Sequence, residues 1–235
     1  MATRRRRSTP GVPEVSVASF FVMGKVICHQ SISLDGYTAG PNQSLENPLG
    51  EGGLRVHQWM FDTNEWRRMQ GLDAVPESAD DAVVRDIASN PDVGAHIMGR
   101  NMFGPIRGEW DLSWRGWWGD NPSYHHPVFV LTHHAREPIP MEGGTTFYFV
   151  TDGIEAAMRQ AREAAGAKDV QIAGGASTVQ QALRAGYLDE LNLHIAPIIL
   201  GKGERLLENV GDLRVAPVEV VASPRVTHIK YRISY

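Results

Sequence analysis

Residues 169–183, DVQIAGGASTVQQAL, join a short apolar run to two adjacent glycines and then to a helical pattern. The apolar run is brief and partly β-branched, which is typical of a buried strand. After the glycines, Val179, Ala182 and Leu183 recur at the spacing of one helix face. The segment therefore predicts a strand that turns tightly into a helix, with the two glycines at the turn.

The same alternation continues on both sides of this segment. From about residue 146 to 200 the sequence reads strand, helix, strand, helix, strand, which predicts parallel strands joined by helical crossovers. Further strands are predicted at residues 25–32, 95–98 and 127–132, and further helices at about 56–69 and 78–89. Two β-rich runs in the tail, on either side of Ser223-Pro224, predict a terminal antiparallel hairpin. We therefore expect an α/β fold with one mixed sheet flanked by helices.

Composition limits the class of protein and its partners. The 235 residues, 42% of them hydrophobic, fit one domain, and no apolar run is long enough to span a membrane. The net charge is −4, and because residues 1–22 carry +3, the remainder from Met23 carries −7. An acidic body is a poor match to nucleic acid or an anionic membrane, so we expect small-molecule partners. The single cysteine, Cys28, excludes an internal disulfide and favours the cytoplasm.

The basic segment at residues 1–22 lacks hydrophobic periodicity, and we expect a disordered extension before a domain at 23–235. Three other interpretations remain open: a secretory or twin-arginine signal, a nucleic-acid arm, and a translation start at Met23 in place of Met1.

Three strand ends carry residues suited to binding phosphate or ribose. Paired glycines before a helix allow close backbone approach, and the helix start favours an anion; a tight packing turn is the alternative. Gly99, Arg100 and Asn101 follow another strand, where a guanidinium offers a bidentate fork. Thr132 and His133 end a third strand with a hydroxyl and an imidazole.

Other chemistries have less support. The histidine pairs at 125–126 and 133–134 are adjacent, so on a strand they point to opposite faces, and we expect no metal. Neither a GxSxG motif nor an activating partner for the cysteine is present. Four tryptophans crowd residues 110–118 without a clear period, which favours a pocket lid or partner interface over a core.

Five motifs in order give the chain a family resemblance: SLDG, MGRNMFG, VLTHH, QIAGGASTVQQAL and LDELNLHIAPIILGKG. Together they resemble the dihydrofolate reductase-like superfamily, and most of all stand-alone relatives of the reductase domain of the riboflavin-biosynthesis deaminase-reductase. The resemblance covers about residues 25–235. It implies a three-layer mixed sheet of eight or more strands, NADPH as the hydride donor, and a homodimer.

The resemblance also implies roles for individual positions. It assigns cofactor binding to these residues: Gly99, Arg100, Asn101, Thr132, His133, Gly174, Gly175, Ala176, Ser177 and Thr178. It brings Ser33, Asp35, Gly36 and Tyr37 near the nicotinamide and substrate.

The acidic groups have several possible roles. Asp35 is expected to be catalytic, as proton donor or relay anchor, although it could instead only cap backbone amides. Asp62 and Glu65, on a predicted helix, are candidates for the acid that faces the substrate.

The resemblance predicts an NADPH-dependent reductase that acts on a flat heterocycle with a carbonyl or imine carbon, similar to 5-amino-6-(5-phosphoribosylamino)uracil reductase. Tyr37 stands where the riboflavin reductases have lysine, their Asp-Asp-Pro segment is missing after Gly99, and Met102 replaces the threonine usual in dihydrofolate reductase. The substrate is therefore open. Dihydrofolate reduction, a non-catalytic dinucleotide-binding module and an oligomerisation domain are the alternatives.

Overall fold

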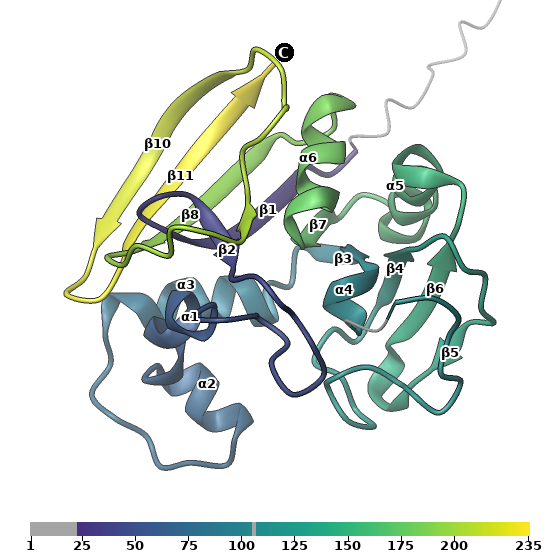
Figure 1. The fold of residues 1–235 in the computed structure, drawn as a ribbon, viewed down its shortest axis with the longest axis horizontal. Helices are drawn as coiled ribbons and strands as arrows, with labels where there is room; N and C mark the ends of the chain where they lie inside the picture. The colour runs from purple at the N-terminus through teal and green to yellow at the C-terminus, as the bar shows by residue number, and fades with distance from the viewer. Residues whose placement is uncertain (1–22, 105–106) are drawn as a thin grey trace, which may run out of the picture.

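Nine strands form one continuous sheet in the computed structural model, which describes residues 23–104 and 107–235 (Figure 1). The strand order across the sheet is β10, β11, β8, β1, β7, β3, β4, β6 and β5. The strand bounds are β1 Val26–Ser33, β3 Val93–Gly99, β4 Pro127–Leu131, β5 Ile139–Pro140, β6 Thr146–Val150, β7 Asp169–Gly174, β8 Glu190–Ala196, β10 Arg214–Ala222 and β11 Thr227–Ser234. The predicted extension at residues 1–22 lies outside the described residues.

The six central strands are parallel, from β8 through β1, β7, β3 and β4 to β6. All eight residues of β1 are buried, as expected for a parallel strand with helices on both of its faces. The parallel strand–helix alternation predicted for residues 146–200 is confirmed. At one edge β11 and β10 run antiparallel and form the predicted terminal hairpin.

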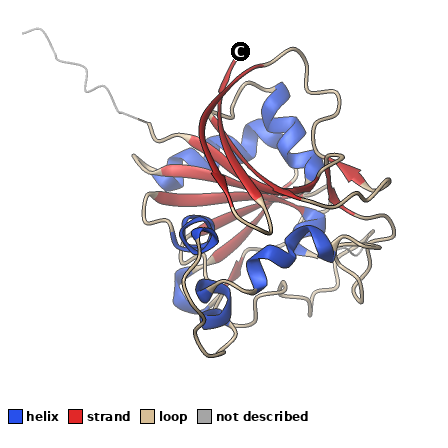
Figure 2. Cartoon of the chain, turned by 90° about the vertical axis from the view of Figure 1, so that its left-hand side faces the viewer, coloured by secondary structure: helices blue, strands red, loops and turns tan. Residues whose placement is uncertain are grey.

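Helices cover both faces of the sheet, which confirms the predicted three-layer mixed architecture (Figure 2). The helix bounds are α1 Leu54–Phe61, α2 Asn64–Met69, α3 Ala79–Ser89, α4 Arg100–Phe103, α5 Gly153–Ala165 and α6 Ala176–Arg184, with a 3-10 turn at Glu142–Gly144. On β7, Val170 belongs to the core that α5 and α6 help to form, whereas the Gln171 side chain reaches the backbone of α3. Because neighbouring strand residues point to opposite faces, α3 lies across the sheet from α5 and α6.

The helix predicted at 56–69 is in fact two helices. Thr63 is extended (φ −82°, ψ 151°), its hydroxyl accepts a hydrogen bond from the amide of Trp66, and it caps α2. Thr63 is fully buried, so the break is held by tertiary packing that the periodicity does not show. By contrast, α3 begins as predicted, where the amide of Ser78 donates to the carboxylate of Asp81.

The tryptophan-rich segment packs on a core, contrary to the expectation that a core role is weak, whereas its role as a pocket lid or partner interface stays a prediction. Trp110, Trp114 and Trp118 pack against a buried cluster that includes Phe103 and Phe147. The aromatic pairs meet mostly edge to face. The core role was not predicted because irregular backbone carries these rings onto β3, β4 and β6, and irregular backbone has no period to detect.

A short second sheet ties the turn after β1 to the loop after β8. In it, β2 (Tyr37–Ala39) pairs antiparallel with β9 (Glu204–Arg205). Neither strand was predicted, because two or three residues give too little pattern to separate from loop. Among the residues described, no helix is long and apolar enough to cross a membrane.

Candidate functional site

Four of the predicted site segments lie together at the carboxyl ends of neighbouring central strands. Strands β1, β3, β4 and β7 are parallel, so their carboxyl ends lie together (Figure 1). Met98 is in register with Gly174, and Gly99 with Leu131, the residue before Thr132. Ligands of open α/β sheets bind at this kind of edge.

The ends of β3 and β7 touch through their glycines. A Cβ on Gly99 would lie 2.6 Å from the hydroxyl oxygen of Thr178, and a Cβ on Gly174 would lie 2.9 Å from Nε2 of Gln30. Gly174 also has φ +122°, a conformation that side chains rarely adopt, and its peptide bond to Gly175 is cis. We call Gly99, Gly174, Gly175 and the first turn of α6 the glycine corner. Both close approaches are to side chains of the protein, as in a packing turn, whereas a Cβ on Gly175 would meet nothing within 4 Å.

The start of α6 supplies free backbone donors. The amides of Thr178 and Val179 donate to the carbonyl of Gly175, whereas the first amides, of Ala176 and Ser177, have no partner within the helix. These amides and the helix dipole favour an anion at the corner.

Arg100 lies directly after the corner glycine of β3. Its guanidinium stacks on the ring of Trp110 at 4.0 Å and donates to the carbonyl of Glu109 at 3.4 Å. Burial, and then the nearby Arg107, lower its pKa from the usual value. Its Nε is buried without a hydrogen-bond partner. A buried guanidinium donor without a partner is suited to an anionic ligand.

The sequence reasoning missed a second arginine beside the same ring. Arg136 lies 5.5 Å from the centroid of Trp110, donates to the carbonyl of Leu112 at 2.9 Å, and has a buried Nη1 without a partner. Its position four residues after Thr132 was a usable signal, because it follows a strand end already singled out.

The remaining cofactor candidates have local partners. The hydroxyl of Thr132 accepts a hydrogen bond from the amide of His134, and His133 is exposed. The Asn101 side chain accepts from Arg107 and donates to Gln43.

Asp35 is tied to a distant loop. Its carboxylate accepts hydrogen bonds from the hydroxyl of Ser33 (2.6 Å) and from the amides of Leu200 (3.1 Å) and Gly201 (2.7 Å). The Ser33 bond first, then the two amides, lower the pKa of Asp35 to about 2. A carboxylate held ionised in this way is a poor proton donor, and the geometry favours the alternative in which Asp35 caps backbone amides.

Tyr37 and Gly36 complete this turn. Gly36 has φ +87°, and its amide donates to the carbonyl of Ser33. The guanidinium of Arg205 lies 4.5 Å from the Tyr37 ring centroid and donates to its hydroxyl at 2.8 Å.

The two helix acids are paired elsewhere. Asp62 forms an exposed ion pair with Arg225 at 2.6 Å. Glu65 is buried against Arg68 and Ser89, and the Arg68 hydrogen bond lowers its pKa. Their assignment to the substrate stays a prediction, without support from these contacts.

Two further features limit which ligands the site can hold. Within residues 23–104 and 107–235, no group of three or more His, Cys, Asp or Glu is arranged to hold a metal ion. Two cavities lie beside α3 and the terminal hairpin, and no residue of the glycine corner lines them. A nucleotide at the corner is therefore supported by unpartnered donors and not by a cavity.

Comparisons with known proteins give a family match and several similar folds. A family profile described as the RibD C-terminal domain matches residues 24–229. No curated protein matches the chain.

Solved structures show the same fold at low sequence identity. A putative riboflavin biosynthesis protein from Shewanella sp. PV-4 is 22% identical, with a TM-score of 0.59 over 90% of this chain and 99% of its own. The riboflavin biosynthesis reductase Rib7 of Saccharomyces cerevisiae is 12% identical, with a TM-score of 0.53 and 91% of each chain covered. For the deaminase/reductase of Thermotoga maritima the identity is 15% and the TM-score 0.51 over 89% of this chain. The alignment covers only 56% of that enzyme's length.

Proposed function

Because this chain belongs to the RibD C-terminal domain family, we propose that it is an NADPH-dependent reductase of a flat heterocycle with a carbonyl or imine carbon. The observation that carries the proposal is the buried, unpartnered Nε of Arg100 beside the glycine corner. A guanidinium donor and the first amides of α6, which have no partner within the helix, fit a phosphorylated dinucleotide.

The residues present fit NADPH. Arg100, with Arg136 beside it, would bind a phosphate group, and the amides of Ala176 and Ser177 would bind the pyrophosphate. Bound NADPH would supply hydride to an electrophilic carbon of the substrate.

The segment after β1 would position the substrate end of the site. Asp35 joins this turn to the loop at residues 200–201, and Arg205 joins the same loop to Tyr37. We propose that these contacts hold the turn in one geometry and keep water from the reacting atoms. Asp35 then acts as a positioning residue.

A second candidate, a dinucleotide-binding module without turnover, is favoured by one observation. The three acidic groups nominated for chemistry, Asp35, Asp62 and Glu65, all have structural partners.

The test is NADPH consumption against a panel that contains the riboflavin-pathway pyrimidine, dihydrofolate and simple carbonyl compounds. Turnover of any member supports the reductase and identifies its substrate class. Stoichiometric NADPH binding without turnover across the panel supports the module, and absence of NADPH binding contradicts both.

A homodimer in the cytoplasm is part of the same proposal. The edge strand β10 pairs only with β11 among the described strands, and Val215, Val218 and Val220 on it are more than half exposed. An apolar edge strand of this kind is suited to a second copy of the chain. Light scattering of V220E against the exposed-loop control L72E tests it, because only V220E should shift the mass to that of a monomer. Equal masses for the wild type and V220E would contradict this interface.

A further inference from the structure

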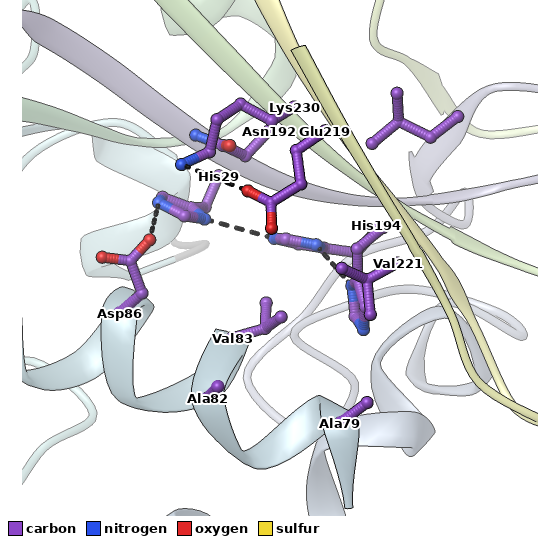
Figure 3. A pocket seen from close by; sticks show the side chains of 12 residues that line it. His29, Ala79, Ala82, Val83, Asp86, Asn192, His194, Glu219, Val221 and Lys230 are labelled. Carbon is purple, nitrogen blue, oxygen red and sulfur yellow. Dashed lines mark hydrogen bonds and ion pairs between the residues drawn. The ribbon is translucent and has the colours of Figure 1, made fainter. Parts of the chain in front are cut away.

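Five titratable side chains form one continuous line between α3 and the sheet, and Figure 3 shows Asp86, His29 and His194 of it. From one end, Asp86 faces His29 (3.5 Å), and Nδ1 of His29 faces Nε2 of His194 (3.3 Å). Nδ1 of His194 then faces Nδ1 of His228 (2.9 Å), and Nε2 of His228 faces Asp80 (3.1 Å). The histidines come from the neighbouring strands β1, β8 and β11, and both carboxylates come from α3.

Only one end of this line reaches solvent. The side chains of His29 and Asp80 are 4% and 1% exposed, whereas that of Asp86 is 41% exposed. His29, Asp86 and His194 also line a cavity of about 280 Å³ between α3 and the terminal hairpin. The line therefore runs from the solvent-exposed carboxylate of Asp86 to the buried carboxylate of Asp80.

Counting protons shows that the line is one proton short. Each of the four contacts needs one N–H or O–H proton to become a hydrogen bond. A neutral imidazole has one N–H, and an ionised carboxylate only accepts. Three neutral histidines thus supply three protons for four contacts, so one contact lacks a donor.

The other partners of Asp80 decide which contact lacks the proton. Asp80 accepts from the hydroxyl of Ser223 and faces the guanidinium of Arg225 at 3.6 Å, so it is surrounded by donors and accepts from His228 as well. His228 must then carry its proton on Nε2, His194 on Nδ1 and His29 on Nδ1, because each bare nitrogen needs a donor from the next ring. Nε2 of His29 is left bare opposite Asp86.

The geometry at His29 agrees with this placement. The contact between His29 and Asp86 is the longest of the four, and Nε2 of His29 is a buried atom without a hydrogen-bond partner. The deficit thus lies at the end where water has access, and where an added proton is attracted by a carboxylate.

We infer that the pair His29 and Asp86 is a proton-uptake site that joins α3 to β1 when it is filled. Uptake turns the fourth contact into a hydrogen bond, whichever of the two atoms carries the proton, and leaves the line with one net negative charge instead of two. The helix so joined leads through residues 90–92 into β3, which ends at the glycine corner.

Charged groups on the other elements that pack around His29 influence the pH at which it takes up the proton. Lys230 of β11 opposes a proton on His29, and Glu190 of β8 favours it. Glu219 of β10 also lines the cavity, and Lys230 lies between it and Glu190. Two more histidines adjoin the line: His57 of α1 acts on His194, and His29 acts on His96 of β3. Burial outweighs these charges and lowers the pKa of His29 to about 4.

Nitrogen NMR of the imidazole rings in the intact protein tests the inference directly. At neutral pH we expect His29 and His194 protonated on Nδ1 and His228 on Nε2. On acidification Nε2 of His29 should gain a proton near pH 4. A neutral-pH spectrum with a proton on Nε2 of His29 would place the deficit elsewhere and overturn the inference.

Asp86→Asn supplies a hydrogen-bond donor to His29 and removes the negative charge beside it, so it separates the effects of the two. An amide N–H fills the fourth contact without proton uptake, so D86N should shift the His29 titration well below that of the wild type and raise the Tm at neutral pH. Asp86→Ala should shift the titration without raising the Tm. Asp92→Asn, the same chemical change on an exposed neighbouring residue, should leave both unchanged. A D86N protein that titrates like the wild type contradicts the proposed site.

Discussion

The hydroxyl oxygen of Thr178 occupies the space beside residue 99 so closely that a Cβ there would lie 2.6 Å from it. Thr178 is buried in the first turn of α6, so it cannot swing into solvent. The relationship packs the end of β3 against α6, which follows β7, and it can be tested from either side.

Gly99→Ala should push α6 away from β3. We expect a loss of about 1–3 kcal/mol in the free energy of unfolding, as for other overpacked sites, together with weaker NADPH binding. Urea unfolding and NADPH titration measure the two effects. Removing the opposing hydroxyl in the double variant G99A/T178A should restore part of both, and a G99A protein with unchanged stability and binding would contradict the close contact.

Arg100→Ala should weaken NADPH binding because a partly buried guanidinium is lost from the phosphate. The expected cost is about 1.5–3 kcal/mol, or roughly 10- to 150-fold in NADPH affinity. Titration with NADH distinguishes the phosphate involved, since equal weakening of NADH would assign Arg100 to the pyrophosphate. Arg159→Ala, an exposed arginine on α5, is the matched control. Unchanged NADPH affinity in R100A would remove Arg100 from the site.

Asp35→Asn should lower kcat/KM without changing the shape of its pH profile. The reason is that Asp35 holds the loop at 200–201 in its ionised form and gives no proton to the substrate. Its folded pKa of about 2 lies below the unfolded value, so its stabilising contribution is present at neutral pH and is lost as the pH falls from about 4 toward 2. The disappearance of one limb of the kcat/KM profile in D35N would instead identify Asp35 as the proton donor.

Mild acid should destabilise the protein through its buried histidines. Burial lowers the pKa of His29 to about 4 and that of His194 well below its usual range. The unfolded chain binds protons at these rings near pH 6.5 and the folded chain does not, so stability is lost as the pH falls from about 6.5 toward 4. Urea midpoints at neutral pH and near pH 5 measure this, and a midpoint that rises on acidification would contradict it.

The sequence predicted those parts of the fold that depend only on residues close together in the chain. The strand–turn–helix at Gly174 and the start of α3 at Ser78 follow from backbone freedom and capping chemistry, which neighbouring residues carry. The break at Thr63 was missed because it depends on burial of that residue by distant elements. The imidazole line was missed for a related reason, since His29, His194 and His228 become neighbours only when β1, β8 and β11 pair.

The candidate site divides in the same way. Gly99 and Arg100 were found because a strand end and a helix start are visible in sequence. The partners of Asp35 were not, because Leu200 and Gly201 are separated from it by more than 160 residues. Arg136 was not predicted as a site residue because its place in the site depends on the ring of Trp110, and the irregular backbone that positions this ring leaves no pattern in the sequence.

The stacking of Arg100 on Trp110 gives the chain a built-in optical reporter. The Arg100 guanidinium lies 4.0 Å from the ring centroid, so we expect an anion that draws it away to change the surroundings of the indole and with them its emission. The occupancy of the corner can therefore be followed by fluorescence in the unlabelled protein. Trp110→Phe keeps an aromatic surface beneath the arginine while removing the signal, so it distinguishes emission of this ring from that of the other tryptophans.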